Sequence, residues 1–151
     1  MSRTTFQTAE QMQEALYKSL YTLADQCPNS INTWMLPKLE SCNLEDKSFV
    51  CSFAMKKEFA NPSGVVLHGG LSGVVFDTAM GWLSSIYAGC MTPTISMTIS
   101  YLRPIPITEP VLVRARLDKP GSTVNYVSAA AYNAGNPEKF LATATGTYYA
   151  K

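Results

Sequence analysis

Residues 68–87 read HGGLSGVVFDTAMGWLSSIY, and this stretch decides the fold because it predicts a long helix from about Gly69 to Tyr87. Apolar residues surround so much of its circumference that most of the helix must be buried; they are Leu71, Val74, Val75, Ala79, Leu83 and Ile86. Asp77 lies in the middle of this apolar surface. At about 100° per residue, several small residues project within roughly 40° of the Asp77 direction, namely Gly70, Gly73, Gly81 and Ser84. We therefore expect the carboxylate to face a gap.

Glycines inside this helix need a compensating reason, because a helical glycine costs about 1 kcal/mol relative to alanine. Close approach of another backbone or of a ligand beside Gly73 and Gly81 would supply one. Tight packing of a sheet on the helix, with Asp77 paired to a nearby donor, explains the same pattern. The spacing alone leaves both interpretations open.

The start of the helix presents free backbone N–H groups near Gly69, Gly70 and Leu71, at the positive end of the helix dipole. These amides are suited to stabilise an oxyanion, and the two glycines carry no side chain that would block a carbonyl group. A tight entry from a loop into the helix is the other interpretation of the Gly-Gly pair. His68 is a lone histidine, which is more often a capping or packing residue than a catalyst.

A period of two residues predicts antiparallel strands on both sides of this helix. Before the helix, the alternation begins at Ser48 and continues through Phe49, Cys51, Phe53 and Met55, until residues 61–64 break it. After the helix, it returns over residues 94–101. Three more strands are expected at Val111–Leu117, Val124–Tyr132 and Phe140–Tyr149, separated by hairpin turns at residues 119–122 and 133–137.

An N-terminal helical segment is expected at about residues 8–27. Thr8 and Gln11 have the spacing of a capping box, and apolar residues follow at helical spacing, at Met12, Leu16, Leu20 and Leu23. Residues 28–46 are rich in turn formers, and we expect Trp34, Leu36 and Leu39 to anchor a covering segment and a first strand.

These elements predict a single α+β domain over residues 1–151, in which one curved antiparallel sheet wraps around the long central helix. A sheet of this kind leaves unpaired edges. Pairing of one edge with a second subunit is therefore expected.

The composition is that of a globular protein with few charges, at 46% hydrophobic residues, 15% charged residues and a formal net charge of +1. Without a cluster of Lys and Arg, nucleic acid is not an expected partner. Four cysteines without C-x-x-C spacing and a single histidine predict reduced core thiols and no metal site. No apolar stretch reaches the roughly 18 residues of a spanning helix, so no membrane partner is expected. Residues 1–10 lack a signal-peptide or transit-peptide pattern, which predicts a cytoplasmic protein.

Residues 61–70, NPSGVVLHGG, followed by DTAMG at residues 77–81, resemble the signature of the phenylacetyl-CoA-thioesterase-like hot-dog family. SYLRP at residues 100–104 resembles the end of that family's strand after the helix. ATATGTY at residues 142–148 resembles its closing strand. The resemblance covers roughly Phe49 to Tyr149 and implies a hot-dog fold and an acyl-CoA thioesterase.

The resemblance implies a role for each matching residue. Asp77 would act on water as a general base or attack the thioester as a nucleophile, and the amide of Gly69 or Gly70 would polarise the thioester carbonyl. His68 would support that loop. Asn61 matches an asparagine that orients the nucleophilic water, although seven residues rather than the usual six separate it from His68. Thr94 matches a hydroxyl that positions water.

In this family each active site is assembled at a dimer interface, so Asp77 would face the His68-Gly69-Gly70 turn of a second subunit. Asp77 lies nine residues after His68, about 13 Å along one helix, which is too far for Asp77 and the amides of its own turn to meet at one carbonyl group. The resemblance thus implies a homodimer or a dimer of dimers. Its substrate would be an acyl-CoA, with coenzyme A as part of the substrate and no further cofactor.

The small side chains of Gly73, Gly81 and Ser84 would then leave room for the acyl group beside Asp77. Met80 and Trp82 are candidates for the pocket wall, although methionines and aromatic residues at this spacing are more often core. Arg103 is a candidate partner of the CoA phosphates.

Two other classes of function remain open. One is a non-catalytic acyl-CoA binding module. The other is a hot-dog dehydratase or hydratase, which is less favoured because the members it resembles pair a histidine and a carboxylate at a different spacing.

Overall fold

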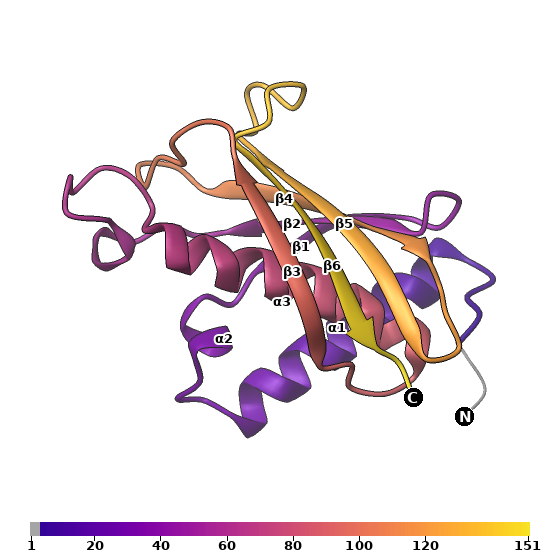
Figure 1. Ribbon diagram of the computed structural model, residues 1–151. Coiled ribbons are helices and arrows are strands. Elements are labelled where there is room, and N and C mark those ends of the chain that lie inside the picture. The colour runs from indigo at the N-terminus through magenta and orange to yellow at the C-terminus, as the bar shows by residue number, and fades with distance from the viewer. Residues whose placement is uncertain (1–3) are drawn as a thin grey trace.

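The computed structural model describes residues 4–151 and confirms the expected α+β architecture, a curved antiparallel sheet wrapped around one long helix (Figure 1). This is the arrangement of a hot-dog fold. The helices are α1 (Ala9–Gln26), α2 (Ile31–Trp34) and α3 (Gly69–Ala88), with a short 3-10 turn, η1, at Lys57–Phe59. The strands are β1 (Lys38–Asn43), β2 (Ser48–Phe53), β3 (Thr94–Tyr101), β4 (Val111–Lys119), β5 (Val124–Tyr132) and β6 (Ala142–Tyr149).

The sheet has six strands in the order β1-β2-β4-β5-β6-β3, and every neighbouring pair is antiparallel. The two predicted hairpins are confirmed, because β4 pairs with β5 and β5 pairs with β6. The strand after the central helix does not pair with the next strand in the chain. β3 instead pairs with β6, with Thr94 opposite Tyr148, and forms one edge of the sheet.

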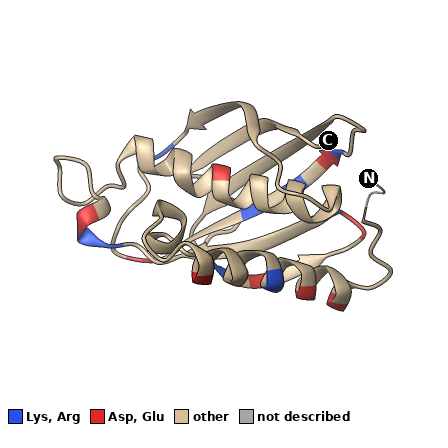
Figure 2. Cartoon of the chain, turned by 90° about the horizontal axis from the view of Figure 1, so that it is seen from below, with Lys and Arg blue, Asp and Glu red and all other residues tan. Residues whose placement is uncertain are grey.

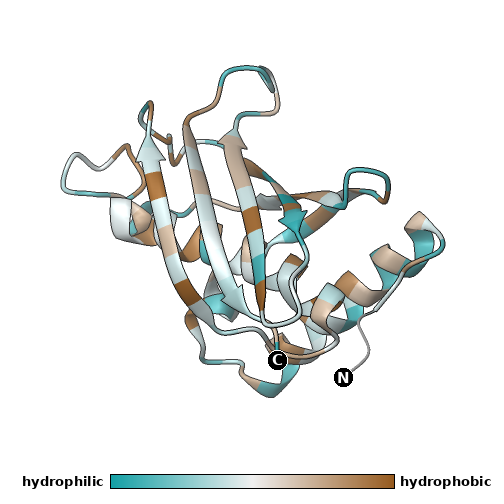
Figure 3. Cartoon of the chain, turned by 45° about the vertical axis from the view of Figure 1, so that its right-hand side comes forward, coloured by the Kyte–Doolittle hydropathy of each residue, from teal (hydrophilic) through white to brown (hydrophobic). Residues whose placement is uncertain are grey.

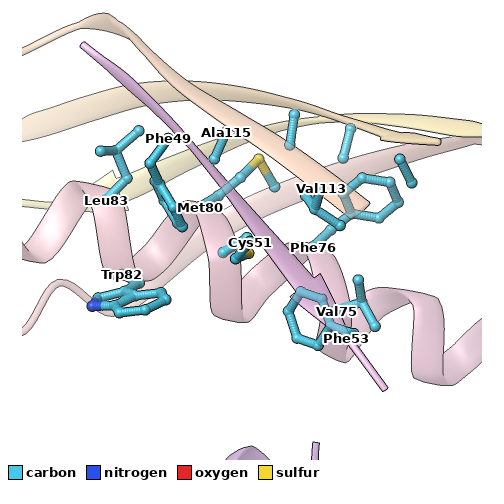
Figure 4. Close-up of a cluster of buried hydrophobic side chains, with 14 of the residues drawn as sticks. Phe49, Cys51, Phe53, Val75, Phe76, Met80, Trp82, Leu83, Val113 and Ala115 are labelled. Carbon is cyan, nitrogen blue, oxygen red and sulfur yellow. The ribbon is translucent and has the colours of Figure 1, made fainter. Parts of the chain in front are cut away.

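Side chains from β2, β4 and α3 meet in the core between the sheet and the helix (Figure 4). The predicted inward positions of β2 are confirmed, since Phe49, Cys51 and Phe53 are each at most 1% exposed. They pack with α3 residues that include Phe76 and Leu83. Burial of each large side chain contributes about 1.5–3 kcal/mol, so this layer fixes the helix on the sheet.

Helix α1 packs along α3, and two hydrogen bonds show that the helices run antiparallel. The indole Nε1–H of Trp82 donates to the Leu16 carbonyl at 3.0 Å, and the Tyr87 hydroxyl lies 3.7 Å from the Met12 sulfur. Of the residues described, none forms a helix with the length and apolar character needed to cross a bilayer.

Thr8 caps α1 as predicted, because its hydroxyl accepts a hydrogen bond from the Gln11 amide. The Gln11 side chain reaches one residue further than a capping box requires, and its oxygen accepts from the Gln7 amide.

The segment between α1 and β2 differs in part from the prediction. Leu39 is buried and Leu36 is partly buried, but Trp34 is 59% exposed. Trp34 ends the single turn of α2, and its neighbour Met35 is the buried residue there. A four-residue helix presents only one face to the core, so one of two adjacent apolar side chains must point outward.

Gly146 on β6 leaves room for a buried aromatic ring. A Cβ atom at Gly146 would lie 2.9 Å from Tyr148 Cε2 and 3.3 Å from the Met80 methyl group, and both of these side chains are fully buried.

We predict that Gly146→Ala destabilises the protein by about 1–3 kcal/mol, because an overpacked interior forces neighbouring side chains out of their preferred positions. Urea unfolding measures the change. Gly135→Ala is the matched control, since a Cβ atom at Gly135 meets nothing within 4 Å. Equal stability of the two variants would contradict this account.

Candidate active site

Asp77 is the only charged residue of α3, and Figure 2 shows a single red segment in the middle of that helix. Its side chain is partly buried. One carboxylate oxygen, Oδ1, accepts hydrogen bonds from Thr94 Oγ1 at 2.5 Å and from the Tyr148 hydroxyl at 3.2 Å. Among residues 4–151, no group donates to Oδ2. One oxygen is therefore held in place, and the other is available to act on a ligand.

Tyr148 is a site residue that the sequence did not identify. Its side chain is completely buried, and burial raises the pKa of its hydroxyl, an effect to which the nearby negative charge of Asp77 adds. Tyr148 therefore stays protonated and donates to Asp77. The sequence signal is the glycine two residues earlier, because Gly146 lies on the same face of β6 and makes room for the ring.

The small residues of α3 do not all border a gap. A Cβ atom at Gly81 would lie 3.3 Å from the Tyr148 ring, so this glycine admits packing of β6 on the helix. Ser84 is completely buried, and its hydroxyl is hydrogen-bonded to Thr92 and Asn125. At Gly73, only the tips of two β3 side chains come near, at ordinary contact distances of 3.9–4.0 Å.

His68 caps the N-terminus of α3 and determines which backbone amides remain free. Its Nδ1 accepts a hydrogen bond from the Gly70 N–H at 3.0 Å. Its carbonyl oxygen accepts from Leu71 and Ser72 at 2.9 and 3.1 Å. Within the part of the chain that the structure describes, the Gly69 N–H has no acceptor. Of the two amides expected to polarise a carbonyl group, Gly69 is thus the free donor, and Gly70 is occupied by the cap.

Tyr101, the last residue of β3, fixes the same turn from the sheet side. Its hydroxyl donates to the Gly69 carbonyl at 2.7 Å. The Gly69–Gly70 peptide unit is therefore held at both ends, because its carbonyl binds Tyr101 and its N–H binds His68. Such a clamp orients the first turn before any ligand arrives.

Two other candidate residues, Asn61 and Arg103, make hydrogen bonds in loops and none to Asp77. The Asn61 side-chain oxygen accepts from the Ser63 amide and hydroxyl, which closes the loop before α3. Arg103 is exposed, and its Nη1 donates to the Phe140 carbonyl at 2.6 Å. Arg103 therefore joins two loops.

A cavity of about 970 Å³ lies between α1, α3 and residues 89–94, and Asp77 and Thr94 line it. Gly81 and Trp82 also line this cavity. Met80 is completely buried in the core and, like Ser84, is not part of the lining. This corrects the expected position of these two side chains beside a substrate: the sheet covers Met80, and a polar network covers Ser84.

No group of three or more His, Cys, Asp and Glu side chains suited to hold a metal ion occurs within residues 4–151. All four cysteines are free thiols. Only Cys51 is buried in the core, where burial raises its pKa. Cys27 is exposed, so the expectation of core thiols is wrong for that residue, which follows the C-terminal end of α1.

Comparison with known proteins connects this site to a family. The model of the thioesterase superfamily matches residues 64–139, which is half of the chain and includes both the His68 turn and Asp77. No curated protein matches the sequence.

Solved structures share the fold. Thioesterase superfamily member 2 from zebra fish is 20% identical with a TM-score of 0.76, and the match covers 90% of this chain and 98% of that chain. A phenylacetic acid degradation-related protein from Ralstonia eutropha is 23% identical with a TM-score of 0.68, with 86% and 98% of the two chains covered. At this identity the likeness shows a common fold.

We predict that Tyr148→Phe makes stability less sensitive to alkaline pH. Because the folded protein raises the pKa of Tyr148, its stabilising effect is complete below the ordinary tyrosine pKa of about 10 and is lost as the pH rises above it. Urea unfolding between pH 8 and 11 should show a steeper loss of stability for the wild type, by up to about 1.4 kcal/mol per pH unit for one proton. Parallel pH profiles would contradict the prediction.

Proposed function

Because the chain belongs to the thioesterase superfamily, we propose that it hydrolyses an acyl-CoA to a free acid and CoA, with CoA as part of the substrate and not a bound cofactor. One observation carries this proposal. The central helix combines a carboxylate with one free oxygen and a first turn with one free amide, which are the groups that thioester hydrolysis needs.

Asp77 supplies the first group. Thr94 and Tyr148 hold Oδ1, so that Oδ2 can remove a proton from water while the water oxygen attacks the thioester carbon. The tetrahedral intermediate then collapses, the C–S bond breaks, and the CoA sulfur takes the proton. Attack by Oδ2 itself, through an anhydride that water then hydrolyses, uses the same geometry.

The Gly69 amide supplies the second group. Its N–H lies in the first turn of α3, where the helix dipole is positive, and the negative charge of the tetrahedral intermediate develops on the thioester oxygen. The carbonyl of the same peptide unit, that of His68, accepts two hydrogen bonds, which polarises the N–H further. His68 and Tyr101 act as positioning residues for this turn.

A complete site requires two subunits. Asp77 and Gly69 are eight residues apart on one helix, or about 12 Å at 1.5 Å per residue, so they cannot bind the same carbonyl group. A second copy that places its Gly69 beside Asp77 satisfies the chemistry and yields two equivalent sites.

The edge strand β3 is suited to this pairing. It contains no charged residue, and its apolar side chains Ile95 and Tyr101 are 55% and 57% exposed. Figure 3 shows the apolar bands that alternate along the strands of the sheet. The opposite edge, β1, is protected by the Lys38–Glu40 ion pair and by an irregularity in its pairing. A dimer formed through β3 would cover the vulnerable edge.

Replacement of Gly69 tests the amide donor directly. Gly69→Pro removes the N–H at the first helical position, where proline fits, and His68 already has the extended conformation that precedes a proline. We expect kcat to fall about 10²- to 10³-fold, the usual effect of losing one oxyanion donor. Gly69→Ala keeps the N–H, and its Cβ atom would meet only Tyr101 at 3.6 Å, so this control should retain most activity.

Mixing of two inactive variants tests the shared site. We expect Asp77→Ala to abolish release of CoA from acyl-CoA while the dimer stays folded. Unfolding and refolding it together with Gly69→Pro should restore about one quarter of the wild-type activity, because half of the dimers are then mixed and each holds one intact site. No recovery from folded, mixed dimers would place both groups in one subunit, and unchanged activity of Asp77→Ala would exclude it as the catalytic carboxylate. Binding of acyl-CoA without release of CoA by the wild type would indicate a binding module.

A further inference from the structure

The cavity beside Asp77 continues as a groove between α1 and α3, well beyond the reacting groups. Along α3 it is lined by residues from Asp77 to Ile86, and onward to Gly89. The α1 wall is one continuous helix face formed by Ala15, Lys18, Ser19, Thr22, Leu23 and Gln26. Both of these walls belong to regular helices, and residues 89–94 line the groove on another side.

The groove combines apolar residues with uncharged polar ones such as Ser19, Thr22 and Ser85. Leu20, Trp82 and Ile86 are buried residues that contribute to its lining. The Trp82 indole is fixed by its hydrogen bond to Leu16 and by an edge-on contact with Phe49 at 5.1 Å between ring centres. Among the described lining residues, Lys18 and Asp77 are the only charged ones.

We propose that this groove binds the acyl chain of the substrate and that the substrates are straight-chain aliphatic acyl-CoA thioesters of about ten carbons or more. This inference rests on the proposed function, since it places the thioester at Asp77. With Lys18 as the only cationic side chain among its described lining residues, the groove is a poor site for a phosphate or a second carboxylate. A short or compact acyl group would leave most of it empty.

The expected length of the acyl chain follows from the distance along α3. Nine residues separate Asp77 from Ile86, which corresponds to about 13 Å along α3. An extended alkyl chain advances about 1.25 Å per carbon, given a C–C bond of about 1.52 Å and an angle of about 111°. About ten carbons therefore reach from the catalytic carboxylate to Ile86. The cavity volume also accommodates a chain of this length, because about 970 Å³ is at the upper end of the range for small-molecule pockets.

Binding of non-hydrolysable acyl-CoA thioethers with two to sixteen carbons tests the groove independently of catalysis. We expect Kd to decrease about threefold to fourfold for each added methylene, as full burial of a methylene predicts, and to level off at or beyond ten carbons. A Kd that does not depend on chain length, or that rises beyond four carbons, would overturn the proposal. Release of CoA from the matching thioesters is measured separately, so that a failure of the hydrolase assignment is distinguished from a failure of the groove.

Lys18→Trp tests the location of the chain. Lys18 is exposed and projects from the α1 wall, so the indole should fill the groove, and the preference for decyl- over butyl-CoA should fall at least tenfold. Gln13→Trp is the matched control, because Gln13 is exposed on the same helix and lies outside the lining. Ser19→Phe fills the groove from the next position if Lys18→Trp does not fold.

Light scattering of the same variants measures their oligomeric state and tests whether a second copy of the chain, rather than an acyl chain, occupies the groove. If Lys18→Trp dissociates the dimer and leaves the chain-length preference unchanged, a helix of a second copy occupies the groove and the proposal is overturned. An unchanged preference in folded, dimeric Lys18→Trp and Ser19→Phe would also overturn it.

Discussion

The rest of this structure depends on holding a carboxylate in the middle of a buried helix. Asp77 loses part of its hydration there, and hydrogen bonds from Thr94 and Tyr148 to a single oxygen compensate for that loss. These two bonds connect α3 to the start of β3 and to β6. The Tyr148 ring needs space between strand and helix, which Gly81 and Gly146 provide. The partly buried carboxylate thus joins the helix to two strands, and its partner Tyr148 explains the position of two glycines.

At the N-terminal turn of α3, three of the first four backbone N–H groups have an acceptor among the described residues, and the N–H of Gly69 has none. His68 uses its side chain on Gly70 and its carbonyl on the two following amides, while Tyr101 binds the Gly69 carbonyl. The remaining Gly69 N–H is held in a fixed direction by its neighbours, which is what an oxyanion donor requires. Because one rigid helix separates this donor from the carboxylate, the same element that prepares both groups prevents them from serving one substrate within a single chain.

Local patterns predicted the elements well and their contacts less well. The period of α3 and the alternation of β5 gave bounds within one residue of those observed, because each depends on residues a few positions apart. The pairing of β3 with β6 was missed, since adjacent strands in a chain usually pair, and here α3 leads the chain to the far edge of the sheet. At Trp34 the single turn of α2 is too short for a hydrophobic period to show which face is buried.

The sequence by itself determined the fold class, the place of Asp77 on a buried helix and the His68 turn that starts it, because caps and periodicity are properties of neighbouring residues. Only the tertiary structure decided that Gly69 rather than Gly70 has the free amide, that Tyr148 donates to a carboxylate 71 residues earlier, and that α1 forms a groove beside it. The physical reason is that these contacts depend on the register of β6 against β3 and on how two helices pack. Neither the register nor the packing is encoded within any single segment.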